Sequence, residues 1–487
     1  MIFTISQWVA LLPILITAAT SVVVMLAIAV RRNHWWNATY CVAGLNLAFL
    51  SVLVAFYQYD GPQQITPLLV IDGYALFYSA LILVLTLATA TLSHAYLEGH
   101  SGHKEEHYVL LSISALGGLV LAGSTHFASF FLGLEILSVP LYGMVAYLYK
   151  DPRSLEAGVK YLILSAVASA FLLFGMALVY SQLGTLGFAE MGRVLSASND
   201  YANAWLLTGV GLILVGVSFK LSLVPFHLWT PDVYEGAPAP VGAFLATVAK
   251  TAVVVVLLRY FVATGAANFD SLITALSAIA FVSILVGNVL ALMQTNIKRL
   301  LAYSSIAHLG YLLVALIASG EFAVEAIGVY LITYSVTTLG AFGVVALMSS
   351  PRGERDADNL YDYRGLFWRR PLLVAILTGM MLSLAGIPIT AGFIGKFYVV
   401  AAGIDARLWW LLGAVVLGSA IGLYYYLRVV VTMFMADPER LKFDAPLDWA
   451  QQVGGVMVLG LAFLMLVLGI YPAPIIDLIR LAGLPVP

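Results

Sequence analysis

Long apolar stretches recur from one end of this sequence to the other, and they constrain the fold more than any other feature. Only 10% of the 487 residues are charged, whereas 62% are hydrophobic. A helix of about 20 apolar residues crosses the roughly 30 Å hydrocarbon core of a bilayer. Strands of a membrane barrel would alternate polar and apolar side chains, and these stretches do not alternate. The chain is therefore predicted to be an all-α, polytopic membrane protein.

The hydropathy pattern divides the chain into about fourteen expected transmembrane helices. No connection between them is long enough to hold a soluble domain. The first helix has neither a basic start nor a small-residue cleavage site, so we expect it to be retained rather than removed as a signal peptide. The expected helices are 7–30, 36–57, 72–97, 106–124, 127–149, 154–182, 203–233, 238–263, 269–292, 298–318, 321–349, 371–402, 408–434 and 450–477.

Lysine and arginine residues are distributed unevenly between alternate loops. Fourteen of the 23 lie in loops that follow odd-numbered helices, and only Arg193, Arg407 and Arg480 lie on the opposite side. Positively charged loops remain on the cytoplasmic side, so both termini are expected on the external side. The fourteen are Arg31, Arg32, Lys104, Lys150, Arg153, Lys298, Arg299, Arg352, Arg355, Arg364, Arg369, Arg370, Arg440 and Lys442. Within helices, Arg259 and Arg428 lie near helix ends and are expected to be interfacial anchors.

Two of the expected helices contain an internal proline, Pro225 in the seventh and Pro388 in the twelfth. A mid-helix proline removes a hydrogen bond and kinks the helix. Such breaks persist at membrane depth where they face protein or a wet cavity, and paired breaks indicate repeats. The two prolines lie 163 residues apart, which predicts two five-helix units, helices 4–8 and 9–13. The alternative is that prolines are simply common in membrane helices.

These units predict the organisation of a single membrane domain over residues 1–487. Because each unit has an odd number of helices, the second is expected to be inverted relative to the first. The predicted parts are three N-terminal helices in 1–105, the first repeat in 106–263, the inverted second repeat in 269–434 and a last helix in 450–487.

Glu135 is the one carboxylate expected deep in the membrane. It lies eight residues into the fifth helix, about 12 Å from its start at 1.5 Å per residue. A charge at the bilayer centre costs about 2.5–3.5 kcal/mol even on lenient scales, so a functional role with a partner is expected. The alternative is a glutamate neutralised by one lysine that only locks two helices together.

Lysines and histidines supply the other ionisable groups inside helices. Lys220, Lys250 and Lys396 lie deep in the seventh, eighth and twelfth helices. Lysines removed from water can exchange protons near neutral pH, which a proton relay requires.

Lys160 lies about two turns inside the sixth helix, so it either joins the relay or reaches the membrane surface with its side chain. His227 and His308 can transfer protons near neutral pH, or they are hydrogen-bonded packing groups.

Sequence features of other function classes are absent. One cysteine, Cys41, excludes an internal disulfide and a cysteine-ligated iron–sulfur cluster. No glycine-rich nucleotide motif or metal-ligand cluster occurs, and Gly395-Lys396-Phe397 is not a phosphate loop. A net charge of −2 does not indicate the basic surface that nucleic-acid binding requires. The chain is expected to bind no cofactor or metal itself, and to move ions with energy supplied elsewhere.

Three segments resemble a known family. Segment 219–241, FKLSLVPFHLWTPDVYEGAPAPV, resembles the signature of the antiporter-like subunits of respiratory complex I, the proton-translocating NADH:quinone oxidoreductase. Segment 134–140, LEILSVP, resembles the glutamate motif of these subunits, and segment 386–397, GIPITAGFIGKF, resembles their twelfth helix. The resemblance covers essentially the whole chain.

Within this family the sequence is most similar to the bacterial subunit N branch. It reads WTPDV at 229–233, where subunits L and M and the multisubunit Na⁺/H⁺ antiporter proteins typically read WLPDA. Those relatives also have a histidine-rich start to the eighth helix, which this chain lacks. Lys396 stands where subunit M typically has glutamate, and the chain has no residues for the lateral helix of subunit L.

The resemblance implies a proton relay along the membrane arm, driven by redox chemistry in other subunits. Glu135 would sense the neighbouring subunit and form an ion pair with Lys220. Lys250, helped by His227 and His308, would connect two half-channels, and Lys396 would be the terminal carrier. Lys160 would modulate Lys220.

The same resemblance implies where the chain lies and what surrounds it. NADH, flavin, iron–sulfur clusters and the quinone (ubiquinone) site would belong to partner subunits. The expected neighbours in the bacterial inner membrane are subunit M, the small subunits K and J, the lateral helix of subunit L, and lipids.

Two alternative functions remain at this point. A subunit of a multisubunit Na⁺/H⁺ antiporter would use an ion gradient, and would show Na⁺-dependent transport without NADH. A purely structural spacer in the arm would tolerate neutral substitutions at every buried lysine.

Overall fold

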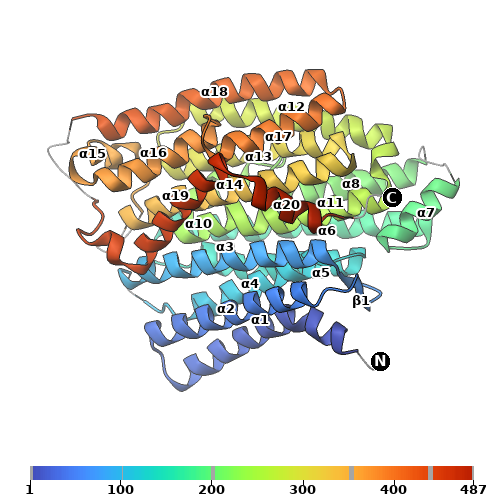
Figure 1. The fold of residues 1–487 in the computed structure, drawn as a ribbon, viewed down its shortest axis with the longest axis horizontal. Coiled ribbons are helices and arrows are strands. Elements are labelled where there is room, and N and C mark those ends of the chain that lie inside the picture. Colours follow the sequence, from blue (N-terminus) through green and yellow to red (C-terminus); the bar gives the residue numbers. More distant parts are fainter. Residues whose placement is uncertain (1–3, 101, 199–202, 350–355, 437–442, 485–487) are drawn as a thin grey trace.

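The computed structural model describes residues 4–484 except 101, 199–202, 350–355 and 437–442. In the described part, eleven helices are long and apolar enough to cross a membrane. These helices run side by side along the long axis of the molecule (Figure 1). This arrangement confirms the prediction of an all-α membrane protein. The relation between the two expected five-helix units stays a prediction.

The N-terminal part forms one flank of the bundle, drawn in blue in Figure 1. Side chains of Thr4, Asn33 and Asp72 each cap the first turn of a helix, as expected for residues that satisfy free backbone N–H groups. A short antiparallel hairpin, which the sequence did not predict, joins the second helix to the third. The elements are α1 (Ile5–Val30), α2 (His34–Tyr57), β1 (Gln63–Thr66), β2 (Leu69–Ile71) and α3 (Gly73–Glu98).

The next part contains the first broken helix and one unexpected short helix. The short helix, α7, buries Phe188, Met191 and Leu195 and leaves Glu190 and Arg193 exposed. The elements are α4 (Glu106–Ala122), α5 (Phe127–Val145), α6 (Pro152–Leu183), α7 (Phe188–Ser198), α8 (Ala204–Lys220), α9 (Trp229–Gly236), α10 (Ala239–Phe244), a π-helical turn (Leu245–Ala249) and α11 (Lys250–Thr264).

The third part contains the centre of the bundle and the second broken helix. Single 3₁₀ turns occupy Ala266–Asn268, Leu360–Tyr363 and Trp449–Gln451. The helices are α12 (Asp270–Leu292), α13 (Ile297–Ala318), α14 (Gly320–Met348), α15 (Leu366–Arg369), α16 (Pro371–Ala385), α17 (Ala391–Asp405), α18 (Trp409–Phe434), α19 (Val453–Ile470) and α20 (Ala473–Leu481).

Both predicted helix breaks are present. The expected seventh helix ends as α8 at Lys220 and resumes as α9 at Trp229, across a stretch that includes Pro225 and the positive-φ residue Ser222. The expected twelfth helix ends as α16 and resumes as α17, and Gly386 at φ 86° allows the reversal between them. The prediction of one continuous last helix over 450–477 was wrong. Pro472 lacks a backbone N–H, and it separates α19 from α20.

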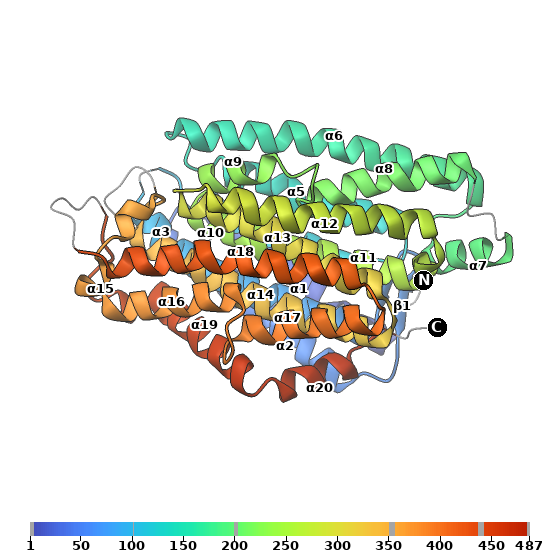
Figure 2. The same cartoon turned by 90° about the horizontal axis from the view of Figure 1, so that it is seen from above.

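The centre of the bundle is formed by α13 and α14, whose membrane-crossing stretches are entirely buried within the chain. Both helices lie in the middle of the bundle in Figure 1 and, seen from above, in Figure 2. Helices α1, α6 and α18 instead have largely exposed apolar faces, as expected for surfaces covered by lipid or by other subunits. Buried ionisable residues in the centre therefore depend on protein groups for hydrogen bonds.

Candidate functional site

Glu135 lies halfway along α5 and is only half-buried within the chain. Its carboxylate accepts a hydrogen bond of 2.6 Å from the hydroxyl of Ser169 on the neighbouring helix α6. Leu132 and Val139, three and four residues away on α5, are more than half exposed. Glu135 therefore lies at the edge of the bundle, between a buried hydroxyl and an apolar outer surface.

Lys220 is the last residue of α8, where the first helix break begins. Its ammonium donates hydrogen bonds of 2.8 Å to Ser138 on α5 and to Ser165 on α6. A cation is also stabilised by the free carbonyl groups at a helix C-terminus. The expected ion pair with Glu135 is not a direct contact in this structure. The two groups interact electrostatically, but each is hydrogen-bonded to serine.

Lys160 lies at the surface, where 41% of its side chain is exposed. It forms ion pairs with Glu156, at 2.6 Å, and with Asp232, at 2.8 Å. Asp232 also binds Arg299, at 2.7 Å. A polar hollow of about 500 Å³, with its open mouth included, lies beside these residues. Lys160 thus belongs to a surface network of charges, and no hydrogen bond connects it to Lys220.

Lys250 is the first residue of α11 and follows directly on the π-helical turn, a type of distortion that is frequent at functional sites. Only 2% of the residue is exposed. Its ammonium donates a hydrogen bond of 2.7 Å to Ser305, which also accepts one of 2.6 Å from Tyr334. The ring of Tyr234 lies 5.9 Å from the ammonium and adds a weak cation–π interaction.

His308 is buried on α13, between two tyrosine hydroxyls. Its Nδ1 lies 2.7 Å from Tyr330 and its Nε2 lies 3.2 Å from Tyr426, which in turn contacts Ser304. The imidazole is also close enough to interact electrostatically with both Lys250 and Lys396. The predicted role of His308 in passing protons between these two lysines stays a prediction.

Lys396 projects from α17 across the second helix break. Its ammonium donates a hydrogen bond of 2.9 Å to the carbonyl of Ala385, the last residue of α16, and lies 5.4 Å from the centre of the Tyr311 ring. The side chain passes over Gly386, where a Cβ atom would approach it to 2.8 Å. The broken helix thus supplies a carbonyl group that accepts a hydrogen bond from the lysine, and space for the lysine side chain.

His227 lies in the first helix break and is buried. In the described part of the chain, its ring nitrogens make no hydrogen bond to another side chain. No contact brings it together with Lys220 or Lys250, so its predicted role in the relay stays a prediction.

Two buried ion pairs were missed by the sequence analysis. Arg259 binds Asp72 through two hydrogen bonds of 2.7 and 2.8 Å, and only 5% of the arginine is exposed. Lys298 binds Asp356 at 2.6 Å, and both side chains are 3% exposed. Tyr96 donates a further hydrogen bond to Asp356. Both pairs join segments that are far apart in sequence, so local patterns gave no signal of them.

The prediction that Arg259 is an interfacial anchor is corrected by its contacts, and Arg428 also has protein partners. Arg259 is held inside the protein by Asp72, as described above. Arg428 is partly buried and donates hydrogen bonds to the carbonyls of Leu292 and Gln294, at the C-terminal end of α12. The burial of Arg259 contradicts its prediction as an anchor, whereas the interfacial position of Arg428 stays a prediction.

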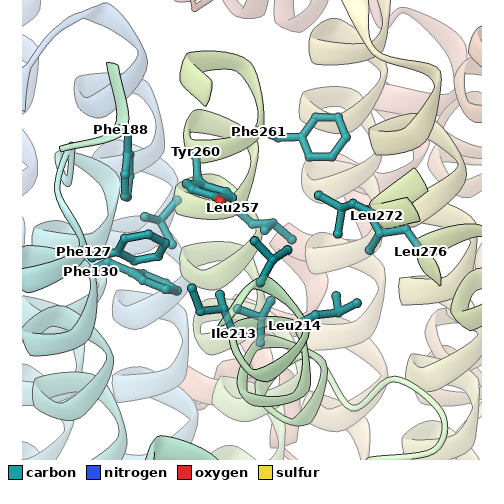
Figure 3. A pocket seen from close by; sticks show the side chains of 13 residues that line it. Phe127, Phe130, Phe188, Ile213, Leu214, Leu257, Tyr260, Phe261, Leu272 and Leu276 are labelled. Carbon is teal, nitrogen blue, oxygen red and sulfur yellow. The ribbon is translucent and has the colours of Figure 1, made fainter. Parts of the chain in front are cut away.

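A separate apolar cavity lies between α5, α7, α8, α11 and α12 (Figure 3). Its volume is about 500 Å³ with its open mouth included. Phenylalanine and aliphatic side chains surround it, and Tyr260 is the only hydroxyl-bearing residue of its lining. A substrate pocket normally adds several convergent polar groups to such a surface. None of Glu135, Lys220, Lys250, His308 and Lys396 lines this cavity.

The buried lysines share one chemical property. Among the described residues, no carboxylate forms an ion pair with Lys220, Lys250 or Lys396, and their partners are hydroxyl or carbonyl oxygens. An ammonium that is buried without a countercharge is only weakly held in its charged form. Such groups can bind and release a proton, as a relay requires.

The sequence is similar to proteins of one family. The family model described as "NADH:quinone oxidoreductase/Mrp antiporter, TM" matches residues 124–422. A relative from Ectopseudomonas mendocina, named NADH-quinone oxidoreductase subunit N, is 59% identical over 99% of this chain and 98% of its own.

Solved structures agree with this similarity. A chain of respiratory complex I from Thermus thermophilus is 34% identical with a TM-score of 0.81, over 96% of this chain and 98% of that chain. A chain of the Mrp complex from Dietzia has a TM-score of 0.84 over 99% of this chain and 97% of that chain, but only 19% identity. The last likeness concerns the fold alone.

Proposed function

The chain belongs to the family of antiporter-like membrane subunits of NADH-quinone oxidoreductase, in its subunit N branch, and we propose that its buried ionisable residues carry protons across the membrane. It is a multi-pass membrane subunit of the proton-translocating NADH:quinone oxidoreductase, respiratory complex I. The alternative of a separate Na⁺/H⁺ antiporter has less support, because the Mrp structure is similar in fold only.

One observation supports this proposal above all others. Glu135 at the edge of the bundle and Lys220, Lys250, His308 and Lys396 inside it form what we call the row, and each is hydrogen-bonded to a hydroxyl or carbonyl oxygen. Three members of the row are lysines that form no ion pair with a carboxylate in the described part of the chain. A protein that needed these residues only for packing would gain stability by replacing them with apolar side chains.

The proposed roles follow from position in the row. Glu135 lies at an exposed edge, where a neighbouring subunit can change its environment. A change of charge there acts on Lys220, and through it on the buried centre. Lys250 and His308 exchange protons by way of Ser305 and the surrounding tyrosine hydroxyls. Lys396 is the terminal carrier.

We further propose that the redox cofactors belong to other subunits of the enzyme. NADH, flavin, iron–sulfur clusters and quinone would bind there, and this chain would bind none of them. Among the described residues, no group of three His, Cys, Asp or Glu side chains is arranged to hold a metal ion. A flavin or haem spectrum that persists after purification to this single chain would disprove the proposal.

The proposed neighbours are subunits M, K and J and the lateral helix of subunit L, with lipids on the remaining surface. Both termini are proposed to face the external side of the bacterial inner membrane, from the distribution of Lys and Arg. Four of those basic residues, Arg352, Arg355, Arg440 and Lys442, lie outside the described residues. A tag after Pro487 should be labelled from the external side, and labelling only from the cytoplasm would contradict this orientation.

Variants Glu135→Gln and Lys220→Met test the relay itself. Each removes one titratable group while nearly keeping its volume, so the subunit should still assemble. In native membranes with matched enzyme levels, both should lower proton pumping and NADH:quinone turnover together, because electron transfer waits for the proton step. Glu321→Gln, an exposed carboxylate at the start of α14, is the matched control. Normal turnover and normal proton-to-electron ratio in both variants would favour the spacer function.

A further inference from the structure

Three serine hydroxyls separate the first two charged groups of the row. Ser138 lies on α5, three residues after Glu135, whereas Ser165 and Ser169 lie one helical turn apart on the same face of α6. All three serines are buried. Ser165 and Ser138 accept hydrogen bonds from Lys220, and Ser169 donates one to Glu135. Adjacent turns of α6 therefore bind the two opposite charges separately.

Serine has a property that fits this position. A hydroxyl both donates and accepts, and it rotates freely to do either. It can accept from a lysine ammonium and donate to a neutral amine. It can donate to a carboxylate and accept from a protonated carboxyl group. The hydrogen bonds therefore survive a change of protonation on either side, and no buried polar group is left without a partner.

A direct ion pair would have the opposite effect. It stabilises the state in which both groups are charged, and breaking it leaves two uncompensated charges. Two groups that are held apart need other hydrogen-bond partners. In this structure, Ser165 and Ser138 bind the lysine, and Ser169 binds the glutamate.

We infer that Ser165 and Ser169 are positioning residues that hold Glu135 and Lys220 apart as separately hydrogen-bonded groups. This inference rests on the proposed relay and adds residues to it. Tyr142 supports the arrangement, because its hydroxyl donates a hydrogen bond of 2.8 Å to Ser165 and gives that serine a second partner. Without the serines, the two charges lose the side-chain hydrogen bonds that bind them separately.

The test uses single substitutions in the assembled enzyme. Ser165→Ala and Ser169→Ala remove one hydroxyl each and leave a smaller side chain that fits the helix. Loss of one hydrogen bond to a charged group should lower turnover and pumping by about tenfold. The KM values for NADH and quinone should stay unchanged, because those sites lie in other subunits.

Two variants separate this role from packing. Ser169→Thr keeps the hydroxyl and should retain most of the activity. Ser154→Ala is the matched control, since Ser154 is a buried serine of α6 that binds only the carbonyl of Val145. It should behave like the unmodified enzyme. If Ser154→Ala were as harmful as Ser169→Ala, loss of packing in α6 would explain both, and the inference would fail.

A double-mutant cycle tests whether Ser169 acts through Glu135. In the Glu135→Gln background, Ser169→Ala should lower turnover by much less than it does alone, because the group it positions is already neutral. Independent, additive losses would refute the inference.

The inference and the proposed function fail in different ways. If Glu135→Gln and Lys220→Met were harmless, the relay itself would be wrong. If those two variants were impaired while Ser165→Ala and Ser169→Ala at matched assembly were both normal, only the positioning role would be wrong.

Discussion

Replacement of Lys250 by methionine separates function from stability more cleanly than any other change in the row. Methionine has nearly the length and volume of lysine and cannot bind a proton. The residue is 2% exposed, and its polar contacts are a hydrogen bond to Ser305 and the weaker interaction with the Tyr234 ring. Ser305 keeps its second hydrogen bond, from Tyr334, when the lysine is removed. The substitution therefore leaves no buried polar group unsatisfied.

The expected effect on stability is small. Loss of a hydrogen bond to a charged group costs about 1.5–3 kcal/mol. Relief of the burial of an ammonium without a countercharge offsets this by a similar amount. Volume-conserving changes in a core otherwise cost less than about 1.5 kcal/mol. We expect the variant to assemble normally and its unfolding midpoint to change little.

The expected effect on activity is large. Without Lys250 the centre of the bundle loses the buried ammonium that is hydrogen-bonded to Ser305. Proton transfer through the centre should then slow by at least about tenfold, or about 1.4 kcal/mol of activation free energy. NADH:quinone turnover and dye-reported proton pumping would be measured in native membranes at matched subunit levels. Lys250→Arg should be equally impaired, because guanidinium does not release its proton.

The reasoning is refuted by either of two results. Full turnover with a normal proton-to-electron ratio in Lys250→Met would show that no proton passes this residue. Rescue by Lys250→Arg would show that a fixed positive charge suffices, which a relay does not permit.

Two further predictions concern the scaffold. Asp356→Ala should lower the free energy of unfolding by about 3–5 kcal/mol, because it leaves Lys298 as an uncompensated charge that is 3% exposed. Thermal denaturation of the assembled enzyme measures this loss. If an added Lys298→Met did not restore most of the lost stability, the prediction would be contradicted. Gly392→Ala should prevent α17 from packing against α16, because the new Cβ would lie 1.8 Å from the carbonyl oxygen of Ser383. Subunit levels in membranes report the result, and Gly413→Ala, which has open space around it, should accumulate normally.

The sequence predicted the helices and the deep residues because both depend on local patterns. High mean hydropathy over about 20 residues indicates a membrane helix, whichever other helices pack against it. Proline removes a backbone N–H wherever it stands, so the breaks at Pro225 and Pro388 were visible without a structure. The rarity of Glu135, Lys250 and Lys396 in apolar surroundings marked them as functional candidates for the same reason.

The two buried ion pairs were missed in the sequence analysis, because the partners come from distant segments of the chain. Lys298 was counted among the loop residues, yet it forms a buried ion pair with Asp356, which comes 58 residues later in the chain. Arg259 appeared to be an anchor at the membrane surface until the fold placed Asp72 beside it, 187 residues earlier in the chain.

The sequence alone thus determined that this chain is a membrane bundle with two broken helices and a set of deep ionisable residues. Only the tertiary structure decided which groups these residues meet: serines between Glu135 and Lys220, Ser305 at Lys250, and a helix-end carbonyl at Lys396. The physical reason is that hydropathy and helix breaks arise within a few turns of one segment. Hydrogen bonds between helices depend on how segments far apart in the chain pack together.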